Sequence, residues 1–485
     1  MTRSLHSIPK SLYSPPMSDK PSSPPSPAPS RSQLMGTQPI GKLLLRFSLP
    51  GVIAMLVNAT YNMVDTIFVG GLGPEAIAAL TVVFPLQMVF IAIGAGTGIG
   101  SSSLISRRLG EGRVEAANQV VGQALVIILI LGILAAIAGH TVGYPLLRVL
   151  GASEAIISDA YSYMIVIASG AIVIFTNMIG NNLIRAEGNP NLPMIAMIAG
   201  AVINIALDPI FIYVLGMGIQ GAAVATIIAR TVGAIVVLTY LFGKRTSFRL
   251  KVSYFKLNFR IWGQIYAVGG PHMLMSLVGS VTMAVVNNVA ATFGPLTIAA
   301  YGVIFRIMQF GFMPCIGIST GALPIIGYNY GAKKYLRVRG TVRRTVLIST
   351  AITMGVSLLA ILFPRQIVSI FNRDPEFLPL AAHAMRIAML GLGFVGAQVA
   401  FATFFQGIGK GIPAAVIGIS RQLLILVPAL LLFAHFFGQE GIWFAIPLAD
   451  VVAFIISLVW TYVVMCKLGI GLWGECKGPK NEVLS

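Results

Sequence analysis

The amino-acid sequence predicts an all-α membrane protein with 12 transmembrane helices in two six-helix bundles that form a parallel repeat. Three observations support this fold class. Hydrophobic residues make up 56% of the 485-residue chain and charged residues only 10%, the mean hydropathy is +0.87, and the second half of the chain repeats the first. Soluble domains carry about 25% charged residues, so the composition excludes an ordinary soluble protein.

Twelve apolar windows follow one another along the chain, each close to the length of about 20 residues that a helix needs to cross a bilayer. They cover residues 43–71, 77–106, 117–141, 159–184, 191–216, 219–243, 264–292, 296–325, 342–363, 380–407, 413–437 and 442–466.

These windows divide the chain into five segments. Residues 1–40, which begin with a Pro- and Ser-rich stretch, are expected to form a disordered cytoplasmic tail, residues 41–243 the N-lobe, 244–262 a cytoplasmic linker, 263–466 the C-lobe and 467–485 a second tail. Met1, Met17 and Met35 are all compatible with a translation start.

The internal repeat becomes visible when the sequence is shifted by 221 positions, because many residues then fall on identical ones without a gap. The matched pairs include Pro50 with Pro271, Gly73-Pro74 with Gly294-Pro295, Gly96 with Gly317 and Gly100 with Gly321. Each unit contains an even number of expected helices, so both units enter the membrane in the same orientation. Parallel repeats of this kind are typical of transporters that alternate access.

The net charge of +18 is explained by basic residues that gather on alternate loops, for example in 107–113, 244–260 and 333–344. The positive-inside rule therefore predicts that both termini are cytoplasmic. This distribution argues against a nucleic-acid partner, and the absence of a GxxxxGK[ST] motif argues against ATP as the energy source. The three cysteines are expected to form no disulfide, since the chain is expected to expose them to the cytoplasm or bury them in helices.

The first apolar window carries a polar face. Asn58, Tyr61, Asn62 and Asp65 are spaced three, four and seven positions apart, which places them on one side of a helix. A carboxylate within hydrocarbon costs about 2.5–3.5 kcal/mol on insertion scales, so Asp65 is interpreted as functional. The alternative is an acid that only caps the helix or reaches the interface, because Asp65 lies near the end of the window.

The fifth and sixth windows supply matching polar groups. Asn204 and Asp208 lie one helical turn apart, Pro209 frees a backbone carbonyl near that turn, and small residues between Gly218 and Thr226 favour close helix packing. Two carboxylates that share a dry site cannot both stay ionised cheaply, so the site is expected to take up and release a proton. Alternatively, oxygens of these side chains and of a backbone carbonyl hold Na⁺. A purely structural role, in which these side chains form hydrogen bonds between helices and take no part in transport, explains Asn204 and Thr226 individually. It explains two buried acids poorly.

Other intramembrane polar groups receive less weight. Asp450 and Arg421 are expected to pair across helices in a structural role. Arg230, Arg306 and Arg386 are expected near helix ends, where they line the cavity or are paired, and they receive no role. The run Gly94-x-Gly96-x-Gly98-x-Gly100 resembles a phosphate loop, but it lies inside an apolar helix and therefore indicates close helix packing.

From about residue 41 to 466 the chain resembles the multidrug and toxic compound extrusion (MATE) family. The motifs that carry the resemblance are Asn62-Met-Val-Asp65-Thr-Ile-Phe-Val-Gly70, Arg185-Ala-Glu-Gly-Asn-Pro190, Asn204-Ile-Ala-Leu-Asp208-Pro209, Gly218-Ile-Gln-Gly-Ala-Ala-Val-Ala-Thr226 and Phe405-Gln406-Gly-Ile-Gly-Lys410. The resemblance implies a cation-coupled exporter of amphiphilic, often cationic drugs in the bacterial inner membrane. We expect a monomer that needs no cofactor beyond H⁺ or Na⁺ and whose partners are drugs and the bilayer.

The resemblance also assigns residues to roles. It places the cation site at Asp65, Asn204, Asp208, Thr226 and the carbonyl of Ala222, with Asp65 and Asp208 as the Na⁺ ligands if the ion is Na⁺. It adds to the surrounding network the residues Tyr163, Asn177 and Asn181, and the bend-forming Pro50. One branch of the family carries acids in the C-lobe, where this chain has Asn287, Asn288 and Gln398. The sequence is therefore closer to the branch that works through the N-lobe.

The expected function is drug export by antiport against H⁺ or Na⁺ through the N-lobe aspartates. The alternative is a flippase for a lipid-linked saccharide, for which we expect a more cationic cavity that holds pyrophosphate. An intramembrane enzyme would need a nucleophile or a metal pair, and the sequence contains neither pattern.

Overall fold

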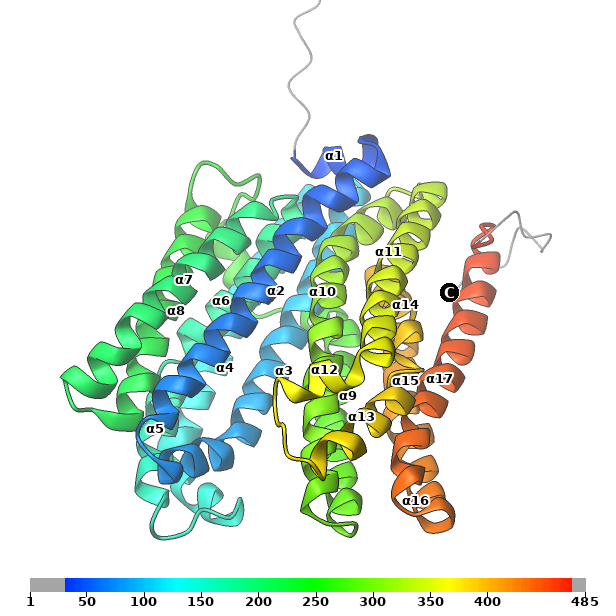
Figure 1. The fold of residues 1–485 in the computed structure, drawn as a ribbon. Coiled ribbons are helices and arrows are strands. Elements are labelled where there is room, and N and C mark those ends of the chain that lie inside the picture. Colours follow the sequence, from blue (N-terminus) through cyan, green and yellow to red (C-terminus); the bar gives the residue numbers. More distant parts are fainter. Residues whose placement is uncertain (1–30, 473–485) are drawn as a thin grey trace, which may run out of the picture.

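The computed structural model describes residues 31–472, and all the regular secondary structure in this part of the chain is helical (Figure 1). The first half contains α1 (Arg31–Thr37), α2 (Ile40–Gly70), α3 (Pro74–Gly110), α4 (Val114–Val149), α5 (Ile157–Ser169), α6 (Ala171–Glu187), α7 (Asn191–Pro209), the π-helical segment η1 (Ile210–Val214) and α8 (Gly218–Phe242). The second half contains the 3₁₀ turn η2 (Val252–Phe255), α9 (Phe259–Ala291), α10 (Pro295–Gly331), α11 (Tyr335–Leu362), α12 (Pro364–Ser369), α13 (Phe377–Ala388), α14 (Leu392–Gly407), α15 (Gly411–Ile419), the π-helical segment η3 (Ser420–Leu426), α16 (Val427–Phe437) and α17 (Gln439–Lys467).

Within the described residues, 10 helices are long and apolar enough to cross a membrane, or 12 if each of two bent pairs counts as one span. The bent pairs are α5 with α6, at 53°, and α13 with α14, at 46°. The glycines at the two bends, Gly170 and Gly391, fall on one another under the shift of 221 positions. The predicted all-α fold with up to 12 spans is therefore confirmed, and the fourth span of each unit is broken at an equivalent position.

The two lobes interlock through their first two long helices. In Figure 1 the blue-to-green helices lie beside the yellow-to-red ones, with α2 next to α10. A Cβ atom on Gly51 of α2 would lie 2.4 Å from the carbonyl oxygen of Gly317 on α10. The repeat-related contact joins Gly96 of α3 to α9, where a Cβ would lie 2.7 Å from the oxygen of Gly269. The glycines thus serve close helix packing, as the sequence indicates.

The linker between the lobes is anchored to the N-lobe. Glu187, at the end of α6, is fully buried and accepts hydrogen bonds from the hydroxyl of Thr246 (3.0 Å) and the backbone N–H of Ser247. Gln123 of α4 donates to the carbonyl oxygens of Tyr254 and Lys256, each at 2.7 Å. The last residues of the range expected for the linker belong to α9, which begins at Phe259.

Two expectations about the ends of the chain differ from the structure. Residues 31–37, assigned to a disordered tail, form α1, because Met35 is buried and its carbonyl accepts hydrogen bonds from Asn329 and Arg337 of the C-lobe. The remaining tail residues, 1–30 and 473–485, lie outside the described residues. Cys466 in α17 is disulfide-bonded, so the expectation of no disulfide, which relied on the cytoplasmic or helix-buried positions expected for the cysteines, is wrong.

Candidate functional site

The site begins with two polar side chains on one face of α7. Asn204 and Asp208 are 1% and 0% exposed, and the Asn204 Nδ2 donates a hydrogen bond to Asp208 Oδ1 at 3.0 Å. The same nitrogen lies 3.4 Å from the hydroxyl of Thr226 on α8, which is 9% exposed. The one-turn spacing in the sequence therefore produces a buried polar cluster between α7 and α8.

The local sequence explains why the chain changes course at this cluster. Pro209 has no N–H and cannot continue the α-helical hydrogen bonds, and α7 is followed at once by η1, where the Leu215 N–H donates to the Ile210 carbonyl at 2.8 Å. A Cβ on Gly221 would lie 2.6 Å from the Phe211 oxygen, so only glycine allows α8 to approach η1 this closely. Single turns of π-helix occur often at functional sites.

Asp65 reaches the same region from α2. Its side chain is partly buried and lies close enough to Asp208 for the two charges to interact. Tyr163 of α5 is close to both aspartates and accepts a hydrogen bond from Gln87 at 2.9 Å. Asp65 of α2, Asp208 of α7 and Tyr163 of α5 thus lie in one region, close enough for their charges to influence one another.

Three oxygen atoms in this cluster have no hydrogen-bond partner among the described residues, although each is buried. They are Asp65 Oδ1, Asp208 Oδ2 and Asn204 Oδ1. An unpaired buried polar atom costs about 1–3 kcal/mol, so the arrangement favours a proton or a cation that these oxygens bind. The described residues contain no group of three or more His, Cys, Asp or Glu side chains that could hold a metal ion, and hard oxygen donors are not the ligands of a soft transition metal.

The remaining residues assigned by resemblance lie in different surroundings. Ala222 is fully buried on α8. Asn177 of α6 donates to the Arg230 carbonyl, and Asn181 donates to the side-chain oxygen of Asn177 at 3.4 Å. Asn62 is exposed and donates to the carbonyl of Asn58 on its own helix at 2.7 Å. Pro50 is buried within α2, next to the contact that α2 makes with the C-lobe.

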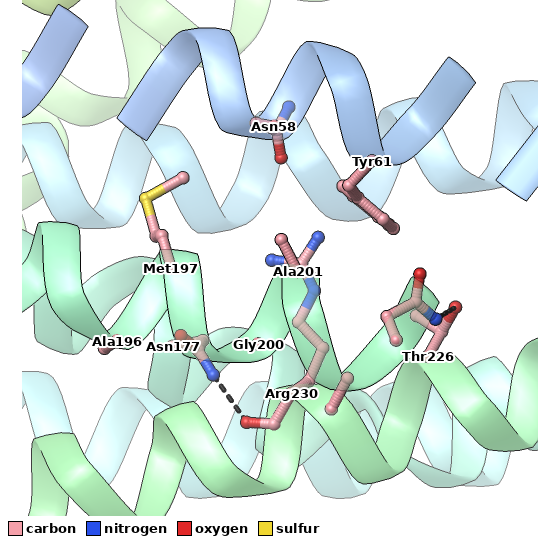
Figure 2. A pocket seen from close by; sticks show the side chains of 11 residues that line it. Asn58, Tyr61, Asn177, Ala196, Met197, Gly200, Ala201, Thr226 and Arg230 are labelled. Carbon is pink, nitrogen blue, oxygen red and sulfur yellow. Dashed lines mark hydrogen bonds between the residues drawn. The ribbon is translucent and has the colours of Figure 1, made fainter. Parts of the chain in front are cut away.

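A small cavity of about 40 Å³ adjoins the polar cluster (Figure 2). Its lining comes from α2, α6, α7 and α8 and consists of Asn58, Tyr61, Asn177, Ala196, Met197, Gly200, Ala201, Asn204, Thr226, Ala229 and Arg230. Drug-sized ligands occupy pockets of about 300–1,000 Å³, so this cavity has room for an ion or a few waters and is smaller than a drug-sized pocket.

Sequence reasoning missed the cavity residue Met197, and it left open whether Arg230 lines the cavity or is paired. Both follow from helical spacing once a neighbour is known to face the cavity: Met197 lies seven positions before Asn204, and Arg230 lies four positions after Thr226. The sequence did not indicate which face of each helix borders the cavity, and this missing information left both placements open.

The C-lobe contains a buried ion pair of its own. Arg421 Nε lies 2.6 Å from Asp450 Oδ1, which confirms the predicted pairing across helices. Under the shift of 221 positions, Arg421 falls on Gly200, one of the residues that line the N-lobe cavity. An arginine therefore stands in the C-lobe where the N-lobe cavity wall has a glycine.

Comparison with known protein families decides the identity of the fold. The model of the MatE family matches two segments of the chain, residues 50–210 and 271–431, and these segments are offset by the same 221 positions as the internal repeat. The chain belongs to the MatE family.

Individual relatives agree with this MatE assignment. The chain is 28% identical over 435 residues to the multidrug export protein MepA of Staphylococcus haemolyticus, covering 89% of this chain and 95% of the relative. It is 26% identical over 421 residues to the FAD transporter of Shewanella oneidensis, covering 85% and 92%. An outward-facing structure of a multidrug resistance MATE family transporter superposes with a TM-score of 0.86 and 33% identity, covering 90% of this chain and 98% of that one.

These similarities establish a multi-pass membrane protein of a multidrug efflux family. Its MatE relatives are transporters rather than enzymes, and those from staphylococci are named as multidrug exporters.

Proposed function

We propose that the protein is a secondary active exporter that exchanges amphiphilic or cationic drugs for H⁺, Na⁺ or both through Asp65 and Asp208. The observation that carries this proposal is the set of three buried oxygens without partners on Asp65, Asp208 and Asn204. These atoms come from α2 and α7, so binding of a cation there supplies missing interactions and draws the two helices together.

Coupling requires that the ion and the drug favour different states of the N-lobe, since a ligand that binds both states equally shifts nothing. The cavity beside the ion cluster is too small for a drug in this state, so drug binding needs α2 to move away from α7 and α8. Pro50 interrupts the hydrogen bonds of α2 and is the pivot that we assign to this movement. Ion binding, which favours the closed N-lobe, then expels the drug.

The test is export of a fluorescent amphiphilic cation from proteoliposomes under Na⁺ and H⁺ gradients imposed separately. Asp65→Asn is expected to abolish export driven by the coupling ion while the protein remains folded in the membrane. Asp159→Asn, which changes an exposed acid of α5, is the matched control and keeps wild-type activity. Unimpaired export by Asp65→Asn would remove Asp65 from the mechanism, and a response to neither gradient would exclude secondary antiport.

A flippase for a lipid-linked saccharide is the second candidate. It calls for a cationic cavity, and Arg230 is the one charged side chain among the described residues that line the cavity. The relative named as an FAD transporter also moves a molecule with a pyrophosphate. Because a single arginine offers little to a pyrophosphate and two carboxyl groups lie close by, drug export is the better supported of the two.

For the membrane arrangement we propose a monomer in the bacterial plasma membrane with both termini in the cytoplasm. The basic residues of the linker and of the loop before α11 support this orientation. Labelling of single cysteines introduced into these loops with a membrane-impermeant reagent tests the orientation, and labelling from outside intact cells would contradict it.

A further inference from the structure

Arg230 is a cation without a counter-ion inside the N-lobe. It lies on α8, and Figure 2 shows its side chain extending across the cavity toward Asn58 and Tyr61 on α2. Its guanidinium carbon is 5.8 Å from the centre of the Tyr61 ring. None of the ion pairs in the described part of the chain includes Arg230, and no side-chain hydrogen bond from it is found there. Membrane-embedded arginines ordinarily pair with an acid or with backbone carbonyls.

The position of this arginine is fixed by its backbone. Asn177 of α6 donates a hydrogen bond to the Arg230 carbonyl. A Cβ on Gly233, one turn further along α8, would lie 2.6 Å from the Asn177 side-chain nitrogen, so the glycine leaves the room that Asn177 needs. The Arg230 backbone is therefore anchored beside the cavity, while no hydrogen bond from its guanidinium is found among the described residues.

The C-lobe offers a contrast to this unpaired arginine. There, Arg421 is neutralised by Asp450 at 2.6 Å. No carboxylate is among the described residues that line the N-lobe cavity beside Arg230. The C-lobe arginine thus has an internal carboxylate, whereas the Arg230 guanidinium faces a cavity whose described lining residues supply none.

We propose that Arg230 is a specificity-determining residue of the N-lobe cavity, which binds a carboxylate of the exported molecule and thereby discriminates carboxylate-bearing amphiphiles from simple cations. A guanidinium fork matches a carboxylate through two parallel hydrogen bonds, and the Tyr61 ring beside it offers an apolar surface for the rest of the molecule. This inference rests on the proposed function, because it takes the N-lobe cavity as the place where the cargo binds.

The test uses two forms of one fluorescent dye, a rhodamine with a free carboxylic acid and its ethyl ester. The acid is a zwitterion and the ester a monocation, so the pair differs mainly at the group that Arg230 binds. Export from proteoliposomes is measured for wild type, Arg230→Met, Arg230→Lys and the control Arg306→Met, which changes an exposed arginine of α10 outside the cavity lining. Arg230→Gln replaces Arg230→Met if the latter fails to fold.

The expected result is that Arg230→Met raises the KM for the acid at least tenfold and leaves export of the ester unchanged or faster. Arg230→Lys keeps the charge but loses the fork, so its KM for the acid lies in between. The inference would be overturned if Arg230→Met lost export of the acid and the ester equally, or if its KM for the acid were unchanged. It would also be overturned if the wild-type protein exported the ester but not the acid. Failure of the wild type to export either dye or any amphiphilic cation would instead overturn the proposed function.

Discussion

Removal of the Arg421 side chain is expected to destabilise the protein strongly, because it leaves the buried carboxylate of Asp450 without a counter-ion. Asp450 is 0% exposed, whereas the Arg421 side chain is 22% exposed. The second oxygen of Asp450 has no partner among the described residues, so Arg421→Met leaves both carboxylate oxygens unpaired in the interior of the C-lobe.

The magnitude follows from the geometry of the pair. Breaking a buried ion pair by removing one partner costs about 3–5 kcal/mol, whereas replacing both partners by apolar residues is often neutral or stabilising. We therefore expect Arg421→Met to cost about 3–5 kcal/mol and the double variant Arg421→Met, Asp450→Leu to recover most of this loss. Asp450→Asn is expected to cost less than Arg421→Met, because the remaining arginine is partly exposed.

The assay is the apparent melting temperature of the purified protein in detergent, followed by size-exclusion chromatography after heating. Arg365→Met, an exposed arginine of α12, is the control and leaves the melting temperature unchanged. A wild-type melting temperature for Arg421→Met would refute the role of the pair in stability. If the double variant is as unstable as the single one, the loss comes from packing and not from the stranded charge. Wild-type transport by the double variant would support a structural pair.

Two further predictions concern packing and the linker. Gly51→Ala places a Cβ 2.4 Å from the Gly317 oxygen, so α2 and α10 must separate at a cost of about 1–3 kcal/mol. We expect this variant to melt at a lower temperature than Gly41→Ala, where a Cβ meets nothing within 4 Å. Equal melting temperatures for the two variants would contradict the close crossing of α2 and α10. Glu187→Gln removes the charge that accepts two hydrogen bonds from the linker, which weakens them and exposes the linker to trypsin. Cleavage there is expected to be faster than in wild type or in Glu154→Gln, whose side chain is 79% exposed, and equal rates would show that Glu187 does not hold the linker.

Much of the fold was predictable because it depends on properties that each segment carries alone. Apolar windows predict helices wherever the bilayer is the solvent, and 12 spans are recovered when the bent pairs α5–α6 and α13–α14 are counted as one each. The repeat was visible because glycine and proline positions survive duplication when close packing or a bend requires them. The bends themselves were not predicted, since Gly170 and Gly391 lie within otherwise unbroken apolar windows.

The candidate site was predictable only in part. Spacing along one helix placed Asn204 and Asp208 together, and in the structure the Asn204 amide also lies 3.4 Å from Thr226 of the next helix, a residue that the sequence assigned to the same site. The same reasoning grouped Asn62 with Asn58 and Tyr61, but Asn62 is exposed and does not line the cavity. Residues spaced three or four positions apart share a broad face of a helix. Which residues of that face contact a neighbouring helix, and which stay exposed, depends on where that helix packs.

By itself, the sequence determined that this chain is a duplicated bundle of membrane helices with acids gathered in its first half, because hydropathy, repeat and charge are properties of the residues in order. Only the tertiary structure decided that the polar cluster of Asn204, Asp208 and Thr226 adjoins a small cavity and that Arg230 faces this cavity without a counter-ion among the described residues. These relations depend on how helices distant in sequence cross and rotate against each other, and the packing of side chains at those crossings sets both.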